Sequence, residues 1–255
     1  MSLQGKFAIV TGGARGIGAG IVRALARNGA NVSFSYVSKS SETQAAKLVE
    51  EVQALGVRAT CVRVDMASPE APTTVLRATL KGLGCDKIDI LVNNAGLGGN
   101  TALKDITPEE YERLMAVNVR AVIFMTQAIL PVIRRGGRII NLSSISARSG
   151  YSTQTVYAAT KAAVEGMTRV WATELGHEYG VTVNAVNPGP VDTDMYRAAG
   201  EVHLSRMEEE NRKVPAAPRC GTEADVADIV SFLCEERSRW ITGDVICANG
   251  GMLYT

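Results

Sequence analysis

Short apolar runs rich in β-branched residues alternate with longer helical patterns along almost the whole chain, and this alternation restricts the fold more than any other feature. Each run is nearly continuous in apolar character, as strands buried on both faces of a parallel sheet are. The predicted strands are Phe7–Val10, Val32–Tyr36, Ala59–Val64, Ile88–Val92, Arg138–Leu142, Val181–Val186 and Val245–Ala248. The predicted helices are Ile17–Asn28, Ser41–Leu55, Pro69–Leu83, Pro108–Arg135, Val156–Tyr179 and Thr222–Glu235. Strands joined through helices predict an α/β fold, a doubly wound and mainly parallel seven-stranded sheet flanked by helices.

No Pro/Gly/Ser-rich linker divides this pattern, so residues 1–255 are interpreted as a single domain. The stretch from about 192 to 221 has no clear period and is interpreted as a mobile insert. It carries apolar side chains amid charged ones, which is typical of a flap over an apolar ligand. These side chains are Met195, Tyr196, Val202, Leu204 and Met207.

Charge and cysteine content disfavour several function classes. With 27 basic and 26 acidic side chains the net charge is +1, whereas nucleic-acid binding needs a clustered basic surface. The basic pair Arg134–Arg135 is interpreted as an exposed helix end. The five cysteines are widely spaced and the chain has two histidines, so no metal site is expected, and isolated thiols indicate a reducing, cytoplasmic compartment. Neither a signal peptide nor an apolar segment of about 18 residues is found, so no membrane association is expected.

The first predicted strand runs directly into a glycine-rich turn, and a helix follows. The turn reads Thr11-Gly12-Gly13-Ala14-Arg15-Gly16-Ile17-Gly18. Glycines here let backbone amides approach a pyrophosphate and leave the helix N-terminus pointing at it. A simple tight turn is the alternative, but the position between the first strand and the first helix favours nucleotide binding.

Polar side chains follow two further strands. The fourth strand is followed by Asn93-Asn94-Ala95-Gly96, which could also be only a strand-ending turn, and the fifth ends in Ser143–Ser144. A helix begins shortly afterwards and places Tyr157 and Lys161 one turn apart on one face. Such a pair can be plain surface packing, but strand carboxyl ends are where doubly wound sheets bind ligands.

With the GxxxGxG spacing of the first turn, these motifs resemble the short-chain dehydrogenase/reductase family over essentially the whole chain. The sequence is most similar to the 3-oxoacyl-carrier-protein reductases and the fungal naphthol reductases of polyketide pathways. The resemblance implies a Rossmann-type domain and a catalytic set of Asn118, Ser144, Tyr157 and Lys161. Ser144 is preferred to Ser143 because it stands thirteen positions before Tyr157, the separation that the family uses.

The resemblance also implies NADP(H) as the cofactor and a set of residues that bind it. These are Gly12, Arg15, Gly16, Ile17, Gly18, Tyr36, Ser38, Lys39, Asp65, Met66, Asn93, Ala95, Gly96, Tyr157, Lys161, Pro188, Gly189, Val191 and Thr193.

The choice of NADP(H) over NAD(H) depends on the end of the second strand. Relatives that use NAD place an acidic side chain there, which repels a 2′-phosphate. This position holds Tyr36, and no Asp or Glu occurs before Glu42. Lys39 and Arg15 instead offer cations. The alternative is that both are ordinary exposed charges and that specificity is merely relaxed.

A chemical mechanism follows from these residue types. Hydride transfer to a carbonyl carbon puts negative charge on the oxygen, and Tyr157 would meet it with a proton. Lys161, as a nearby cation, would lower the pKa of Tyr157. The resemblance to the family further implies that Lys161 bonds the nicotinamide ribose, that Ser144 binds the substrate oxygen and that Asn118 supports a water chain that returns the proton to Lys161. We expect an NADP(H)-dependent oxidoreductase acting on a ketone or secondary alcohol, with a bulky apolar or polyketide-like carbonyl as substrate.

Alternatives of other classes stay open. The chain could be a redox-sensing scaffold that binds NADP(H) without turnover, or an enzyme that works mainly as an alcohol dehydrogenase. A hydrolase is disfavoured because Ser144 is not in a GxSxG turn.

The family commonly forms tetramers through its two long helices and the C-terminal segment, so a homotetramer is expected. The predicted helix Val156–Tyr179 is rich in small and apolar residues on more than one face, as an interface helix would be. Burial within the monomer core explains part of that pattern.

Overall fold

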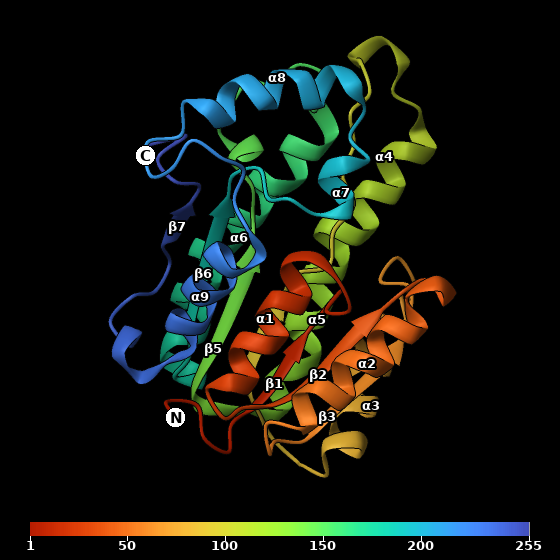
Figure 1. The fold of residues 1–255 in the computed structure, drawn as a ribbon. Coiled ribbons are helices and arrows are strands. Elements are labelled where there is room, and N and C mark those ends of the chain that lie inside the picture. The colour runs from red at the N-terminus through yellow and green to blue at the C-terminus, as the bar shows by residue number, and fades with distance from the viewer. Residues whose placement is uncertain (255) are drawn as a thin grey trace.

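A seven-stranded sheet forms the centre of the protein in the computed structural model, which describes residues 1–254 except for the side chain of Val202 (Figure 1). The strand order is β3-β2-β1-β4-β5-β6-β7, and each of the six described pairings is parallel. The order reverses beside β1, so a crevice is expected where β1 and β4 end. The strands are β1 (Phe7–Val10), β2 (Asn31–Tyr36), β3 (Ala59–Arg63), β4 (Ile88–Asn93), β5 (Ile133–Leu142), β6 (Thr182–Pro188) and β7 (Val245–Ala248).

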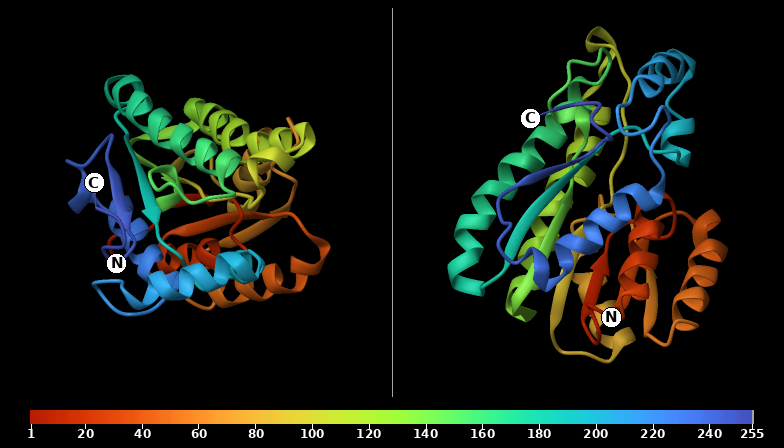
Figure 2. Two further views of the ribbon diagram at one scale, coloured as in Figure 1. Left: turned by 90° about the horizontal axis from the view of Figure 1, so that it is seen from above. Right: turned by 60° about the vertical axis from the view of Figure 1, so that its left-hand side comes forward.

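Helices cover both faces of this sheet, as the view from above shows (Figure 2). One face carries α1, α2 and α9, with α1 packed between the other two, and the opposite face carries α3, α5 and α6. The helices are α1 (Gly16–Arg27), α2 (Glu42–Gln53), α3 (Ala71–Leu83), α4 (Pro108–Met115), α5 (Ala121–Ile129), α6 (Thr155–Tyr179), α7 (Asp194–Arg197), α8 (Glu201–Arg212) and α9 (Glu223–Cys234).

The central strands are apolar on both sides because each face of the sheet has its own core. Ile90 and Val92 of β4 pack on the side of α1 and α9, whereas Leu91 packs on the side of α3 and α5. All three side chains are buried. The alternation of side chains along a strand therefore serves two helical layers, which is why the sequence reads as a continuous apolar run.

The helix predicted over Pro108–Arg135 is a continuous helical run over Pro108–Val132, so the prediction is wrong for its last three residues. The structure has α4, a π-helical turn over Ala116–Arg120, α5 and a short 3₁₀ turn over Leu130–Val132. Strand β5 then begins at Ile133, earlier than predicted, so Arg134 and Arg135 lie in a strand and not at a helix end. Pro131 has no amide donor with which to continue the helix, and this favours the change to extended backbone.

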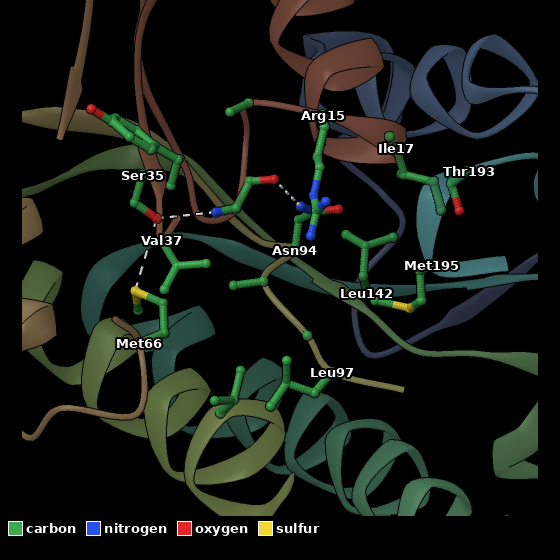
Figure 3. A pocket seen from close by; sticks show the side chains of 18 of the residues that line it. Arg15, Ile17, Ser35, Val37, Met66, Asn94, Leu97, Leu142, Thr193 and Met195 are labelled. Carbon is green, nitrogen blue, oxygen red and sulfur yellow. Dashed lines mark hydrogen bonds between the residues drawn. The ribbon is translucent and has the colours of Figure 1, made fainter. Parts of the chain in front are cut away.

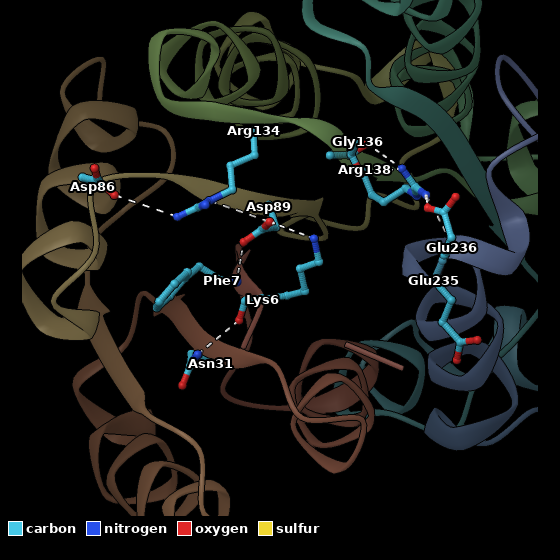
Figure 4. Close-up of polar contacts among 11 residues, drawn as sticks. Lys6, Phe7, Asn31, Asp86, Asp89, Arg134, Gly136, Arg138, Glu235 and Glu236 are labelled. Atoms are coloured by element: carbon cyan, nitrogen blue, oxygen red, sulfur yellow. Dashed lines mark hydrogen bonds and ion pairs between the residues drawn. The ribbon is translucent and has the colours of Figure 1, made fainter. Parts of the chain in front are cut away.

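Ion pairs hold the amino ends of the strands together (Figure 4). The buried carboxylate of Asp89 accepts from the backbone amide of Phe7 at 2.9 Å and from Lys6 Nζ at 3.2 Å, and it lies 3.9 Å from Arg134 Nε. Nearby, buried Arg138 donates to the carboxylate of Glu236 at 3.2 Å. This cluster stabilises the end of the sheet opposite to the carboxyl ends of the strands.

By length and composition alone, the helical run Pro108–Val132 could cross a membrane, with a mean hydropathy of 1.5, although the sequence predicts no such segment. Within the protein, 44% of the 18-residue apolar window in this run is buried, because α5 packs against α3 and β4. A core helix with apolar residues on its exposed side passes the same test, so the run is weak evidence for a membrane span.

The region without a clear period forms two helices, α7 and α8, and not the aperiodic insert that the sequence predicts. It leaves and rejoins the fold at an isolated bridge between Val191 and Gly221, and α8 crosses the end of the molecule at which the strands finish (Figure 1). The period of α8 is hidden because the helix is mostly charged. Met207 is its fully buried apolar side chain, and Glu208 pairs with Arg212 at 2.6 Å.

Candidate active site

Two cavities lie at the carboxyl ends of the strands and meet at a shared wall. The larger has a volume of about 330 Å³ and the smaller about 160 Å³. The larger extends over the ends of β1, β2 and β4 to the start of α1, and the smaller lies beneath the α7–α8 insert. The residues common to both are Ile17, Ser143, Tyr157, Pro188, Thr193 and Met195.

The glycine-rich turn forms one wall of the larger cavity, and its glycines have a steric reason. A Cβ added at Gly18 would lie 2.2 Å from the carbonyl oxygen of Gly12, and Gly16 has a positive φ of 56°. No side chain fits at the first position, and the second is strained for any other residue. The N-terminus of α1, with no acidic residue in its first turn, therefore faces the cavity as an anion site.

Asn94 fixes the turn from below (Figure 3). Its Nδ2 donates to the carbonyl oxygens of Thr11 at 2.8 Å and Gly12 at 3.0 Å. The preceding residue, Asn93, which the sequence predicts as a cofactor contact, lies buried in β4 and bonds Asn141 and Thr126 instead. Neighbouring residues of an extended chain face opposite ways, so Asn94 faces the glycine-rich turn and Asn93 faces away from it. The same alternation is the signal that identifies Asn94.

The prediction that Tyr36 stands at the end of the second strand is confirmed, because Tyr36 is the last residue of β2. Its side chain lines the larger cavity. Lys39 and Ser38 do not line it, and the Ser38 hydroxyl lies 2.7 Å from that of Ser41. Arg15 lines the cavity but pairs with Asp194 of the insert at 3.4 Å, with both side chains more than half exposed.

The larger cavity thus collects most of the predicted cofactor-binding set. Its predicted members are Gly12, Arg15, Gly16, Ile17, Gly18, Tyr36, Asp65, Met66, Ala95, Gly96, Tyr157, Lys161, Pro188 and Thr193. Gly189 and Val191 line the smaller cavity, and Ser38, Lys39 and Asn93 line neither. Residues that the sequence analysis missed come mainly from strand ends and from α4 and α7, and include Ser35, Val37, Ser41, Val64, Asn94, Leu97, Arg113 and Met195.

Lys161 is a buried cation at the floor of the larger cavity. Its Nζ donates to the carbonyl oxygen of Leu142 at 2.8 Å and lies 5.8 Å from the centroid of the Tyr157 ring. Burial lowers the pKa of Lys161 to about 8. Burial raises the pKa of Tyr157, and the Ser144 hydroxyl opposes this shift by hydrogen bonding. Desolvation is the larger of these two effects, so the pKa of Tyr157 lies above its ordinary value, and the lowering of this pKa by Lys161 stays a prediction.

The structure distinguishes the two adjacent serines at the end of β5. Ser143 turns its hydroxyl away to the buried carboxylate of Glu165, at 2.9 Å, and to the carbonyl oxygen of Lys161, at 3.4 Å. Ser144 lines the smaller cavity, and its hydroxyl is bonded to Ser146 at 3.2 Å and close enough to Tyr157 to affect the pKa of the phenol. The geometry favours Ser144 over Ser143 as the residue that faces a ligand.

Glu165, which the sequence analysis did not identify, ties three segments together behind Ser144. Its Oε1 accepts from Ser143 Oγ at 2.9 Å and from Asn187 Nδ2 at 2.8 Å, and its Oε2 accepts from Arg148 Nε at 2.8 Å. Asn187 Nδ2 also donates to the carbonyl oxygen of Ser144 at 2.8 Å. Because Glu165 lies one helical turn after Lys161, the i,i+4 spacing could have drawn attention to it.

Asn118 lies in the π-helical turn between α4 and α5, a distortion that often occurs at functional sites. Its side chain bonds both backbone groups of Leu97, at 2.8 and 2.9 Å, and donates to Thr160 Oγ1 at 3.1 Å. A Cβ added at Gly96 would lie 3.4 Å from Asn118 Oδ1 and 3.5 Å from Lys161 Nζ. Asn118 therefore holds the backbone of Leu97 in place and also lies close to Lys161.

Comparisons with known proteins agree with this geometry. Residues 12–253 match the family model described as enoyl-(acyl carrier protein) reductase. The chain is 50% identical to the short-chain dehydrogenase/reductase FrzI of Cladobotryum sp, over 99% of this chain and 97% of that one.

Solved structures give the same result. A blue fluorescent protein from a metagenomic library, in complex with NADPH, superposes with a TM-score of 0.92 at 43% identity over 100% of both chains. The angucycline C-6 ketoreductase LanV with bound NADP gives a TM-score of 0.91 at 35% identity, over 99% of this chain and 97% of that one. The chain belongs to the short-chain dehydrogenase/reductase family.

Proposed function

We propose that this protein is an NADPH-dependent ketoreductase that interconverts a ketone and a secondary alcohol. The observation that carries the proposal is the position of Tyr157 in the wall shared by the two cavities, with Lys161 on the side of the larger and Ser144 on the side of the smaller. From this position a proton donor can protonate the carbonyl oxygen of a substrate in the smaller cavity, while the carbonyl carbon receives hydride from a cofactor in the larger cavity. The similar proteins crystallised with NADPH or NADP support the choice of cofactor.

The larger cavity fits a dinucleotide. The N-terminus of α1 and the glycine-rich turn would hold the pyrophosphate, and Asp65 lines the cavity where an adenine would lie. Tyr36 occupies the place of an acid at the end of β2, so no carboxylate there opposes a 2′-phosphate. Arg15 would provide the cation for this phosphate.

The protein supplies position and protons, and the nicotinamide supplies the hydride when bound. Ser144 would donate a hydrogen bond to the carbonyl oxygen and orient it. Tyr157, which burial keeps protonated, would transfer its proton to that oxygen as negative charge develops. Lys161 would stabilise the resulting phenolate and return a proton to it, and Asn118 would support a water chain that reprotonates Lys161.

The test is NADPH consumption with a panel of ketones. A bulky, largely apolar ketone is the proposed substrate class, because Met195 and Met207 from the insert line the smaller cavity. Tyr157→Phe should keep NADPH binding and thermal stability but lose nearly all turnover, because the ring packs equally and cannot donate a proton. Activity of the variant within about tenfold of the parent, about 1.4 kcal/mol of barrier, would overturn the mechanism.

The same assay separates the other candidates. NADPH binding without turnover of any ketone would favour the redox-sensing scaffold, and faster alcohol oxidation than ketone reduction at neutral pH would favour an alcohol dehydrogenase. Because the matched family model is described as enoyl-(acyl carrier protein) reductase, the assay also includes an enoyl thioester as a comparison substrate.

We further propose that the protein is a homotetramer of the cytoplasm. Exposed apolar side chains on α5 and α6, which cover the same face of the sheet, support an interface there, with Phe124 46% and Val170 53% exposed. Trp240, between α9 and β7, is 95% exposed and marks a second candidate contact. In the described chain the five cysteines are free, which agrees with a reducing compartment.

A further inference from the structure

Two of the residues that line the smaller cavity carry a buried polar atom that has no hydrogen-bond partner among the described residues. Gln154, which lies just before α6, lines this cavity together with Ser144 and Tyr157 and is only 7% exposed. Its Oε1 is buried and has no hydrogen-bond partner among the described residues. The Nδ1 atom of His203 on α8 is in the same situation and belongs to the same cavity wall. Six such atoms occur in the described part of the chain, so two in one small cavity indicate a polar group that binds there.

A chain of amide hydrogen bonds determines which atom of Gln154 is left over. Asn100 Nδ2 donates to the backbone carbonyl of Ala199 at 3.3 Å, which orients its Oδ1 toward Gln154. Gln154 Nε2 donates to that Oδ1 at 3.1 Å. Reversing the Gln154 amide would bring two oxygens together, so the free atom is an acceptor.

An acceptor of this kind requires a donor from a ligand. Leaving a buried acceptor unpaired costs about 1–3 kcal/mol, and an O–H group in the cavity would remove that cost. The other cavity-lining side chains include the apolar Ile145, Val191, Met195 and Met207, which suit a carbon framework and offer no donor of their own.

We propose that the ketone bound in the smaller cavity is a hydroxyketone, with a hydroxyl group that donates to Gln154 Oε1 and a framework that packs on the apolar wall. This inference rests on the proposed function, because it takes Ser144 and Tyr157 as the site of the carbonyl. His203 Nδ1 offers a second contact for the same hydroxyl or another one. Burial and the neighbouring Arg206 lower the pKa of His203, so its imidazole is neutral near pH 7 and does not select for an anionic substrate.

A structural role for Gln154 makes a different prediction. The bonds from Gln154 through Asn100 to Ala199 join the start of α6, the loop after β4 and the insert, and could serve only as a latch for the insert. If so, removing either amide would impair all ketones to the same degree. If Gln154 accepts a hydrogen bond from a hydroxyl of the ketone, only the loss of Gln154 itself would remove the preference for hydroxylated ketones.

The experiment compares 1-tetralone with the set of its ring-hydroxylated derivatives, using the full-length enzyme and NADPH. We expect kcat/KM to be about tenfold higher for at least one hydroxylated ketone, the value of about one net hydrogen bond of 1.4 kcal/mol. Gln154→Met, of similar size but without an acceptor, should abolish this preference, so that kcat/KM becomes equal for 1-tetralone and its hydroxylated derivatives. Asn100→Asp is the matched control, because it loses the donor to Ala199 and so breaks the latch, but it still accepts from Gln154 Nε2 and keeps Oε1 as the free atom, so the preference should persist.

Binding of the same ketones to the NADP⁺-loaded protein, followed by thermal shift, separates the two proposals. Turnover of the ketones with no preference in either assay would overturn this inference and leave the ketoreductase standing. A preference in binding that Gln154→Met removes, without turnover by the parent enzyme, would support the hydroxyl contact and overturn the proposed function. Equal losses for all ketones in Gln154→Met and Asn100→Asp would show a latch, and the inference would be wrong.

Discussion

Lys161 is a buried cation whose charge is costly in the folded protein. Its folded-state pKa is about 8, against an ordinary value of 10.5, because it is fully buried. Between these two pH values the unfolded chain holds a proton that the folded chain has lost, so stability rises as pH increases. The free energy of unfolding of the parent, minus that of Lys161→Met, should increase by about 3 kcal/mol from pH 8 to pH 10.5. Urea titrations at a series of pH values measure it, and a constant difference would mean that Lys161 is not desolvated.

The two serines at the end of β5 should respond differently to the same substitution. Ser144→Ala should lower kcat severely, because it removes the donor beside Tyr157, whereas Ser143→Ala should act more on stability through Glu165. Steady-state kinetics and melting temperatures of both variants test this. Equal losses of kcat would show that the choice between them is wrong.

Arg15 should determine preference for NADPH, although its partner in the structure is Asp194. Arg15→Ala should raise the KM for NADPH about tenfold or more and leave the weaker NADH activity almost unchanged, because a charge-assisted bond to phosphate is lost. Asp194→Asn is the matched control, since it frees the same guanidinium and should not raise the KM for NADPH. Equal efficiency of the parent with NADH and NADPH would refute the cofactor choice.

At the scale of elements, Glu165 connects α6 to the turn after β5 and to β6. Glu165→Gln keeps the volume but places an amide among three donors, so the turn that carries Ser144 should shift. We expect kcat to fall about tenfold with little change in the KM for NADPH, together with a lower melting temperature. A lower melting temperature with unchanged kcat would limit Glu165 to a structural role.

At the scale of the whole molecule, the tetramer predicts a mass of about 108 kDa by light scattering, four times the chain mass of 27.1 kDa. Phe124→Glu places a charge on the exposed face of α5 and should reduce that mass without unfolding the chain, because the side chain is already half exposed. Leu55→Glu, at an apolar residue 45% exposed in the turn after α2, serves as the charge-matched control, because it makes the same change from an apolar side chain to a carboxylate. A monomer at working concentration would reject the assembly.

The sequence by itself determined the parallel sheet and its strands, because burial on two faces leaves a direct pattern in the chain. Its resemblance to a family supplied the set of Ser144, Tyr157 and Lys161 as a prediction. The sequence also located the insert but not its helices, since charged residues hide the period of α8.

Only the tertiary structure decided what depends on neighbours distant in sequence. Asn94, and not the predicted Asn93, contacts the glycine-rich turn. The long helix ends before Ile133, and burial raises the pKa of Tyr157. The tertiary structure also brought Gln154 and His203 to one cavity wall and left an acceptor there without a donor. Desolvation and hydrogen-bond satisfaction are properties of the packed chain, and no local pattern of residues encodes them.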